Sequence, residues 1–321
     1  MRSVLVDGRP VSVVGLGCWQ FGSRAWGYGS VFGAREARAI VERALELGIT
    51  LFDTAEMYGR GASERILGEA LGDRADSVFL ATKFLPVLPT AGRLVAACEA
   101  SLRRLAVERV SLYQLHFPNP IIPLSRQMEG MRRVLDRGLA THAGVSNFSR
   151  RRWLAADRAL GRPILANQVR YNLLQREAER ELVPFAAREG RLIIAYSPLA
   201  QGVLGGRYGP GAPPQDFRRR NPLFTPANLA RASRLLDTIG EVARGHGATA
   251  SQVALAYLCA QPQVVVIPGA RSVAQLEANA AAADLELSAD EVGRLRAAAA
   301  SFLPARPAAY RQILGSLARR P

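Results

Sequence analysis

The chain has 321 residues, of which 49% are hydrophobic, and its 42 basic side chains outnumber 27 acidic ones. A chain of this length and composition can bury a large apolar core as one domain. The sequence contains neither the long uncharged apolar run of a membrane span nor the basic flank and cleavage site of a signal peptide. We therefore expect one soluble domain over residues 1–321, located in the cytoplasm.

The net charge of +15 raises the question of a nucleic-acid partner. The arginines, however, are spread through every segment, and aromatic residues do not alternate with them. An arginine-rich solvated surface accounts for the charge, so we expect no nucleic-acid or membrane partner. Cys18, Cys98 and Cys259 are odd in number and widely spaced, which favours reduced thiols and no structural metal.

The first predicted elements are a β-hairpin that turns at Asp7-Gly8 and a strand over residues 13–17. An Asp-Gly pair supplies the positive φ angles that a two-residue hairpin turn needs. A glycine-rich loop follows the strand. Such a loop cannot bury its aromatic side chains alone, so we expect Trp19 and Trp26 to line a pocket.

Strands and helices then alternate along the chain. Further apolar runs of strand length cover residues 49–52, 78–82, 110–115, 140–145, 164–167, 192–195 and 264–267. Apolar residues recur with helical spacing at 37–47, 63–71, 94–105, 125–137, 227–244 and 251–260, and again from 273 and from 288. This order predicts a (β/α)8 TIM barrel, with the N-terminal β-hairpin across one end and extra C-terminal helices.

Three consecutive predicted strands each end in an ionisable residue. Asp53, Lys83 and His116 stand at these ends, and Tyr58 follows Asp53 by five positions. Lys83 is the only lysine among the 42 basic residues. Taken singly, each residue has an ordinary structural explanation. Parallel barrel strands, however, present their carboxyl ends at one catalytic face, so we expect the four side chains to meet there.

Four motifs resemble the signatures of the aldo-keto reductases: Phe52-Asp53-Thr54-Ala55-x-x-Tyr58-Gly59, Ala81-Thr82-Lys83, Tyr113-Gln114-Leu115-His116 and Gly144-Val145-Ser146-Asn147. The resemblance implies an NAD(P)H-dependent enzyme that reduces an aldehyde or ketone to an alcohol. Hydride would come from the nicotinamide and a proton from Tyr58. Lys83 would stabilise the phenolate, Asp53 would hold Lys83, and His116 would orient and polarise the carbonyl.

Polar residues at later strand ends and a glycine-rich loop suit a dinucleotide. Backbone amides of the loop after residue 200 can approach phosphate oxygens, and the helix from residue 273 offers its N-terminus to an anion. By resemblance, the residues expected to bind the cofactor are Trp19, Ser146, Asn147, Gln168, Tyr196, Ser197, Leu199, Gln201, Gly202, Leu204, Gly269, Arg271, Gln275 and Asn279. NADPH is the expected cofactor. NADH is the alternative, because Gly269 and Ala278 replace a lysine and a glutamate found in many members.

Trp19, Trp26, Phe84 and Phe117 are the expected contacts of a small carbonyl substrate. A long loop is predicted at about 200–226 and a C-terminal tail from about 302. Two alternatives stay open: a non-catalytic NADP(H) sensor or regulatory subunit of the same fold, and a Schiff-base aldolase that uses Lys83. The sequence specifies neither the substrate nor the choice between a monomer and a homo-oligomer.

Overall fold

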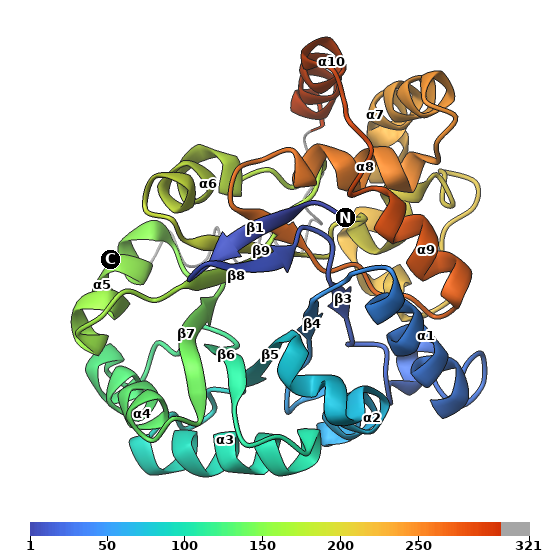
Figure 1. Ribbon diagram of the computed structural model, residues 1–321. Helices are drawn as coiled ribbons and strands as arrows, with labels where there is room; N and C mark the ends of the chain where they lie inside the picture. Colours follow the sequence, from blue (N-terminus) through green and yellow to red (C-terminus); the bar gives the residue numbers. More distant parts are fainter. Residues whose placement is uncertain (303–321) are drawn as a thin grey trace.

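Eight parallel strands form the centre of the computed structural model, which describes residues 1–302. They are β3 (Leu16–Gly17), β4 (Leu51–Asp53), β5 (Phe79–Phe84), β6 (Val110–Leu115), β7 (Ala140–Ser146), β8 (Ala166–Arg170), β9 (Leu192–Tyr196) and β10 (Val264–Val266). Each strand pairs with its sequence neighbour, and a parallel bridge between Val14 and Val266 joins the two ends of the sheet. Figure 1 shows the resulting ring, which confirms the predicted (β/α)8 barrel.

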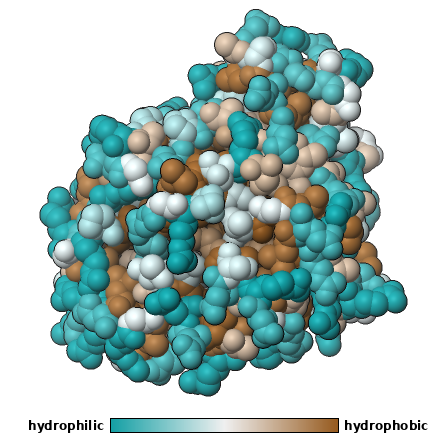
Figure 2. Space-filling model, viewed as in Figure 1, coloured by the Kyte–Doolittle hydropathy of each residue, from teal (hydrophilic) through white to brown (hydrophobic). Residues whose placement is uncertain are grey.

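Helices cover the outside of the ring (Figure 1). They are α1 (Ala34–Glu46), α2 (Ala62–Leu71), α3 (Ala91–Leu105), α4 (Leu124–Asp136), α5 (Arg150–Leu160), α6 (Ala178–Arg188), α8 (Ala250–Cys259) and α9 (Val273–Ala281). Strands covered on both faces need apolar residues on both, which explains their nearly continuous apolar runs. On the face shown in Figure 2, hydrophilic side chains cover most of the outer rim.

The N-terminal hairpin closes the end of the barrel where the strands begin. It consists of β1 (Ser3–Val6) and β2 (Arg9–Ser12), and Figure 1 shows it lying across the ring. Asp7 and Gly8 have φ angles of 47° and 77°, as a two-residue turn of this kind requires. Val6 and Val11 of the hairpin pack against Leu51, the first residue of β4. The opposite end of the barrel, where the strands finish, is left for the site.

Two further helices, α7 (Pro226–Gly245) and α10 (Ala289–Ala300), pack against one another outside the ring. They confirm the extra helices predicted toward the C-terminus. A hydrogen bond between His246 and Glu291, with 2.8 Å between Nε2 and Oε1, joins them. The sequence predicted neither α5 nor α6; in α6, Pro184 interrupts the helical pattern.

The long segment after β9 contains three short 3-10 helices: η4 (Ala200–Gly205), η5 (Phe217–Arg220) and η6 (Pro222–Phe224). Three more of these helices are η1 (Arg24–Trp26), η2 (Tyr58–Gly61) and η3 (Gly72–Ser77). Within residues 1–302, no helix is both long enough and apolar enough to cross a membrane. The predicted tail lies outside the described residues from 303 onward.

Close packing between α2 and α3 fixes the helix that follows Tyr58. A Cβ added at Gly68 would lie 2.4 Å from the carbonyl oxygen of Leu105, a backbone atom that cannot move aside alone. We expect Gly68→Ala to lower the free energy of unfolding by about 1–3 kcal/mol, as overpacking does. Gly293 in α10 has open space around it, so Gly293→Ala should raise stability by up to about 1 kcal/mol. Chemical denaturation of both variants checks this; equal effects would contradict the packing argument.

Candidate active site

Four polar side chains converge at the carboxyl ends of β4, β5 and β6. Lys83 on β5 donates a hydrogen bond to Asp53 at the end of β4, with 2.6 Å between Nζ and Oδ2. The same ammonium lies 3.3 Å from the hydroxyl oxygen of Tyr58. The ring of His116, directly after β6, meets the ring of Tyr58 edge-on, with 5.6 Å between centroids. The structure therefore brings together the four residues that the sequence suggested as catalytic.

Lys83 and Asp53 form an ion pair that is almost entirely removed from solvent. Their side chains are 0% and 2% exposed, and Lys83 also donates to the carbonyl oxygen of Thr54 at 2.7 Å. Burial alone would lower the pKa of Lys83, but attraction to Asp53 and Tyr58 outweighs it and the pKa is raised. Lys83 is therefore a fixed ammonium at physiological pH.

The phenol of Tyr58 keeps its proton in the free protein. Burial raises its pKa above the ordinary value, while Lys83 opposes that rise and Asp53 adds to it. Lys83 thus does not bring this pKa below its ordinary value, because burial and the nearby carboxylate outweigh the ammonium. A protonated phenol beside a fixed cation is the state that a proton donor needs at neutral pH.

Two amide side chains hold the second oxygen of Asp53. Gln168 on β8 donates from Nε2 to Oδ1 at 2.8 Å, and Gln114 on β6 donates to the same oxygen at 3.4 Å. An ionised carboxylate only accepts hydrogen bonds, so the orientation of both amides is determined chemically. The ion pair therefore has partners on both sides of the carboxylate, which a buried charge requires.

His116 presents a neutral imidazole to the site. Burial, followed by the positive charge of Lys83, lowers its pKa to about 3. The ring of Phe117 stacks on the imidazole, with 4.6 Å between centroids and an angle of 10° between the planes. A neutral imidazole held in this way can donate an N–H bond to a carbonyl oxygen near Tyr58 without carrying a charge.

The residues expected at the nicotinamide are linked to one another by hydrogen bonds. The hydroxyl of Tyr196 donates to Oδ1 of Asn147 at 2.9 Å, and Asn147 donates from Nδ2 to Oγ of Ser146 at 3.0 Å. Ser146 in turn donates to the backbone carbonyl of Gln168 at 2.9 Å. Gln168 also donates from its side-chain amide to Asp53, so this one residue contacts Ser146 through its backbone and the ion pair through its side chain.

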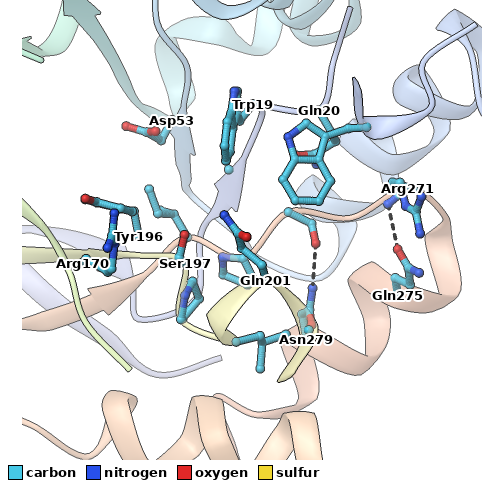
Figure 3. A pocket seen from close by; sticks show the side chains of 18 of the residues that line it. Trp19, Gln20, Asp53, Arg170, Tyr196, Ser197, Gln201, Arg271, Gln275 and Asn279 are labelled. Atoms are coloured by element: carbon cyan, nitrogen blue, oxygen red, sulfur yellow. Dashed lines mark hydrogen bonds between the residues drawn. The ribbon is translucent and has the colours of Figure 1, made fainter. Parts of the chain in front are cut away.

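A cavity of about 690 Å³ joins these groups to the N-terminus of α9. Figure 3 shows Asp53 and Tyr196 on one side of the cavity and Arg271, Gln275 and Asn279 on the other. Gln275 accepts a hydrogen bond from the backbone N–H of Arg271 at 2.9 Å, and Asn279 donates to the carbonyl oxygen of Gly269 at 3.4 Å. The cavity therefore extends from the buried Lys83–Asp53 pair at the catalytic end to the cation Arg271 at the other.

Most of the predicted cofactor and substrate residues line this cavity. They are Trp19, Trp26, Phe117, Ser146, Asn147, Gln168, Tyr196, Ser197, Leu199, Gln201, Gly202, Gly269, Arg271, Gln275 and Asn279. Leu204 does not line it; its side chain is part of the hydrophobic core instead. Phe84 does not line it either. Side chains alternate along a strand, so Phe84 points away from the barrel interior that Lys83 faces and packs in the outer core.

Several residues that the sequence did not suggest also line the cavity. Gln20 lies against Gly269 and donates from Nε2 to the carbonyl oxygen of Ala270 at 2.9 Å. Arg207 and Arg218 come from the segment after β9, and the Arg218 guanidinium lies 5.5 Å from the centre of the Trp26 ring. Arg170 ends β8 and lies over the Tyr196 ring. Arg207 and Arg218 had a signal in the sequence, because they belong to the glycine-rich segment after residue 200. Gln20 had none, and Arg170 lies beyond the predicted strand over residues 164–167.

The arrangement matches a known family. A model of the aldo/keto reductase family matches residues 13–300. The chain belongs to this family. An uncharacterized oxidoreductase of Mycobacterium tuberculosis is 53% identical over 305 residues, which cover 95% of this chain and 94% of the relative. The methylglyoxal reductase YeaE of Escherichia coli is 33% identical over 287 residues, or 88% of this chain and 89% of its own.

Solved structures of family members share the fold. The thermostable aldo-keto reductase Tm1743 in complex with the inhibitor epalrestat has a TM-score of 0.77 and 32% identity, covering 92% of this chain and 98% of its own. An aldo/keto reductase from Klebsiella pneumoniae in complex with NADP and acetate has a TM-score of 0.74 and 28% identity, covering 96% and 98%. These findings confirm the predicted family, the fold and the enzyme class, an NAD(P)H-dependent aldo-keto oxidoreductase.

The buried ion pair makes a specific stability prediction. Lys83→Met leaves the carboxylate of Asp53 buried without its cation, so the free energy of unfolding should fall by about 3–5 kcal/mol. Adding Asp53→Asn removes the unpaired charge, and the double variant should recover a large part of the loss. Urea denaturation of the three proteins measures this. A double variant no more stable than Lys83→Met would show that burial of the charge is not the cause.

Proposed function

We propose that this chain reduces an aldehyde or ketone to an alcohol with NADPH, and that Tyr58 is the proton donor. The observation that carries the proposal is the convergence of Tyr58, Lys83, Asp53 and His116 at one end of a cavity. Such a set can deliver a proton to a carbonyl oxygen while a fixed cation stabilises the charge left behind.

The rest of the cavity fits a dinucleotide. Ser146, Asn147 and Gln168 offer amide and hydroxyl groups to a carboxamide, and Tyr196 offers an aromatic face to its ring. At the far end, Arg271 and the N-terminus of α9 suit an adenosine phosphate. When bound, the nicotinamide supplies the hydride. The Klebsiella pneumoniae relative in complex with NADP supports the same cofactor here.

Proton donation follows from the charges around Tyr58. Its hydroxyl is protonated at neutral pH, and the substrate oxygen would take that proton as negative charge builds on it. The phenolate left behind would lie 3.3 Å from the Lys83 ammonium, which Asp53 keeps in place. His116 would donate an N–H bond to the same oxygen, because its imidazole is neutral and lies beside the Tyr58 ring.

The Schiff-base alternative conflicts with the state of Lys83. An amine that attacks a carbonyl must be unprotonated and reachable. Here the pKa of Lys83 is raised, its side chain is fully buried, and its ammonium is hydrogen-bonded to Asp53 and Thr54. The sensor alternative shares the cofactor site and differs only in turnover, so steady-state NADPH oxidation with a panel of aldehydes separates it from an enzyme.

The proton-donor role is tested by Tyr58→Phe, which removes the hydroxyl and keeps the ring. We expect turnover to fall by about 10²-fold or more, the usual scale of general acid catalysis. NADPH affinity, measured by fluorescence titration, should stay within about twofold, because the hydroxyl acts in the transition state and not in ground-state binding of the cofactor. A variant with wild-type turnover would reject Tyr58 as the donor, and a large loss of NADPH affinity would indicate a binding role.

A further inference from the structure

An exposed apolar surface borders the catalytic end of the cavity. Apart from Val31, the large hydrophobic side chains exposed on the loops after β3, β4, β5 and β6 are Trp19, Met57, Val87, Leu88, Phe117 and Ile121, which we call the apolar wall. These four strands are neighbours in the sheet, so their loops adjoin. Trp19, Met57 and Phe117 also line the cavity, so the wall continues from the catalytic residues outward.

Buried polar groups hold part of this wall in its outward position. Asn119 donates from Nδ2 to the carbonyl oxygen of Pro86 at 2.8 Å and accepts from the backbone N–H of Ile121 at 2.8 Å. It therefore ties the loop of Val87 and Leu88 to the loop of Phe117 and Ile121. Gln127 and Arg152 secure the second loop through hydrogen bonds to the carbonyl oxygens of Ile122 and Asn119. A loop held rigid with apolar side chains in solvent is preorganised for an apolar ligand.

Charge divides the mouth of the cavity into two sides. The arginines that line the cavity in the described chain, Arg170, Arg207, Arg218 and Arg271, all come from β8 or from segments after β9 and β10. The lining contributed after β3, β4 and β6 is aromatic or apolar except for Gln20 and the catalytic residues. An anionic ligand group is favoured on the arginine side, and an apolar ligand group on the side formed after β3, β4 and β6.

We propose that the apolar wall binds the hydrocarbon part of the substrate, and that the substrate class is aldehydes or ketones with a long or bulky apolar substituent. This inference rests on the proposed function. With the carbonyl at Tyr58 and His116, the substituent would leave the cavity over Phe117 and reach Ile121, Val87 and Leu88. Small hydrophilic carbonyls would leave these side chains uncovered.

The first test is a series of straight-chain aldehydes from propanal to decanal with wild-type protein and NADPH. We expect kcat/KM to rise about twofold per added methylene group. This corresponds to about half of the free energy that full burial of a methylene group contributes. A flat series, or a preference for glyceraldehyde over hexanal, would overturn the proposal. If no aldehyde is reduced, the proposed function itself fails; binding of decanol without NADP, followed by tryptophan fluorescence, then tests the wall separately.

Ile121→Ser provides the decisive variant, because Ile121 is 83% exposed and its replacement does not disturb the core. We expect kcat/KM for decanal to fall about threefold or more, with propanal unchanged, since only the longer chain reaches this side chain. Leu5→Ser is the matched control: Leu5 is 66% exposed on the hairpin at the other end of the barrel, and neither substrate should respond. Equal losses for both aldehydes, or a dimer that Ile121→Ser dissociates, would reject the wall as a substrate surface.

A second feature, the hydrogen bond between Gln168 and Asp53, connects the cofactor end of the site to the proton donor. Gln168 uses its amide nitrogen on Asp53, so its side-chain carbonyl oxygen is the group left for a carboxamide. We infer that Gln168 is a positioning residue for the Lys83–Asp53 pair as well as part of the nicotinamide site. This also rests on the proposed function, but its first test does not require turnover.

Lys83 is the only lysine in the chain, so selective ¹⁵N labelling of lysine gives one side-chain Nζ signal that reports on the ion pair. In the free protein, Gln168→Met should shift this signal and speed hydrogen exchange of the ammonium about tenfold, because a hydrogen bond to the charged partner is lost. Asn147→Ala, which changes the nicotinamide site without touching Asp53, should weaken NADPH binding and leave the Lys83 signal unchanged.

Turnover provides the second measurement for Gln168. We expect Gln168→Met to lower kcat about tenfold even with saturating NADPH, the effect of one lost hydrogen bond to a charged group. Leu5→Ser, on the hairpin at the other end of the barrel, is the control outside the site and should keep full kcat. A Lys83 signal in Gln168→Met identical to wild type, with only NADPH binding weakened, would reduce Gln168 to a cofactor contact. In that case, NADPH-dependent turnover of the wild-type protein would still support the proposed function, and only the positioning role of Gln168 would be rejected.

Discussion

The buried ion pair of Lys83 and Asp53 is the constraint on which the rest of the site depends. An ammonium and a carboxylate inside a protein are costly to desolvate, and each is tolerated because the other is in contact with it. Their partners are all fixed by the barrel: the backbone of Thr54 on one side, and the amides of Gln114 and Gln168 on the other. The barrel thus holds a fixed charge beside Tyr58 before any ligand binds.

The barrel achieves this through two layers of side chains in its interior. Near the start of the strands, Leu51, Phe79, Leu112 and Leu192 pack with the hairpin residues and exclude water. Above them, the inward-facing residues include Asp53, Lys83, Gln114 and Gln168 of the site. The hairpin therefore does more than cover an apolar end. By excluding water from below, it keeps the surroundings of the ion pair apolar, and the electrostatic influence of Lys83 on Tyr58 is stronger there than it would be in water.

The sequence predicts the parts of the site that depend on strand order and strand ends. Asp53, Lys83 and His116 could be placed together because each ends a buried apolar run, and parallel strands end at one face. Strand alternation also contained the information that Phe84 faces away from Lys83, although the prediction did not use it. The segment after β9 was less predictable: Ser197, Ala200 and Gln201 have positive φ angles, which non-glycine residues rarely adopt and which no local pattern signals.

The direction of an amide side chain was also beyond the sequence. Ser146, Asn147 and Gln168 were expected to face a carboxamide, yet they are hydrogen-bonded to one another and, through Gln168, to Asp53. The side chain of Gln168 therefore lies between the two ends of the site. Any ligand that draws on the free carbonyl oxygen of Gln168 polarises its amide, and a polarised amide is a stronger donor to Asp53. If Gln168 binds the carboxamide as proposed, cofactor binding would be coupled through this one side chain to the charge beside Tyr58.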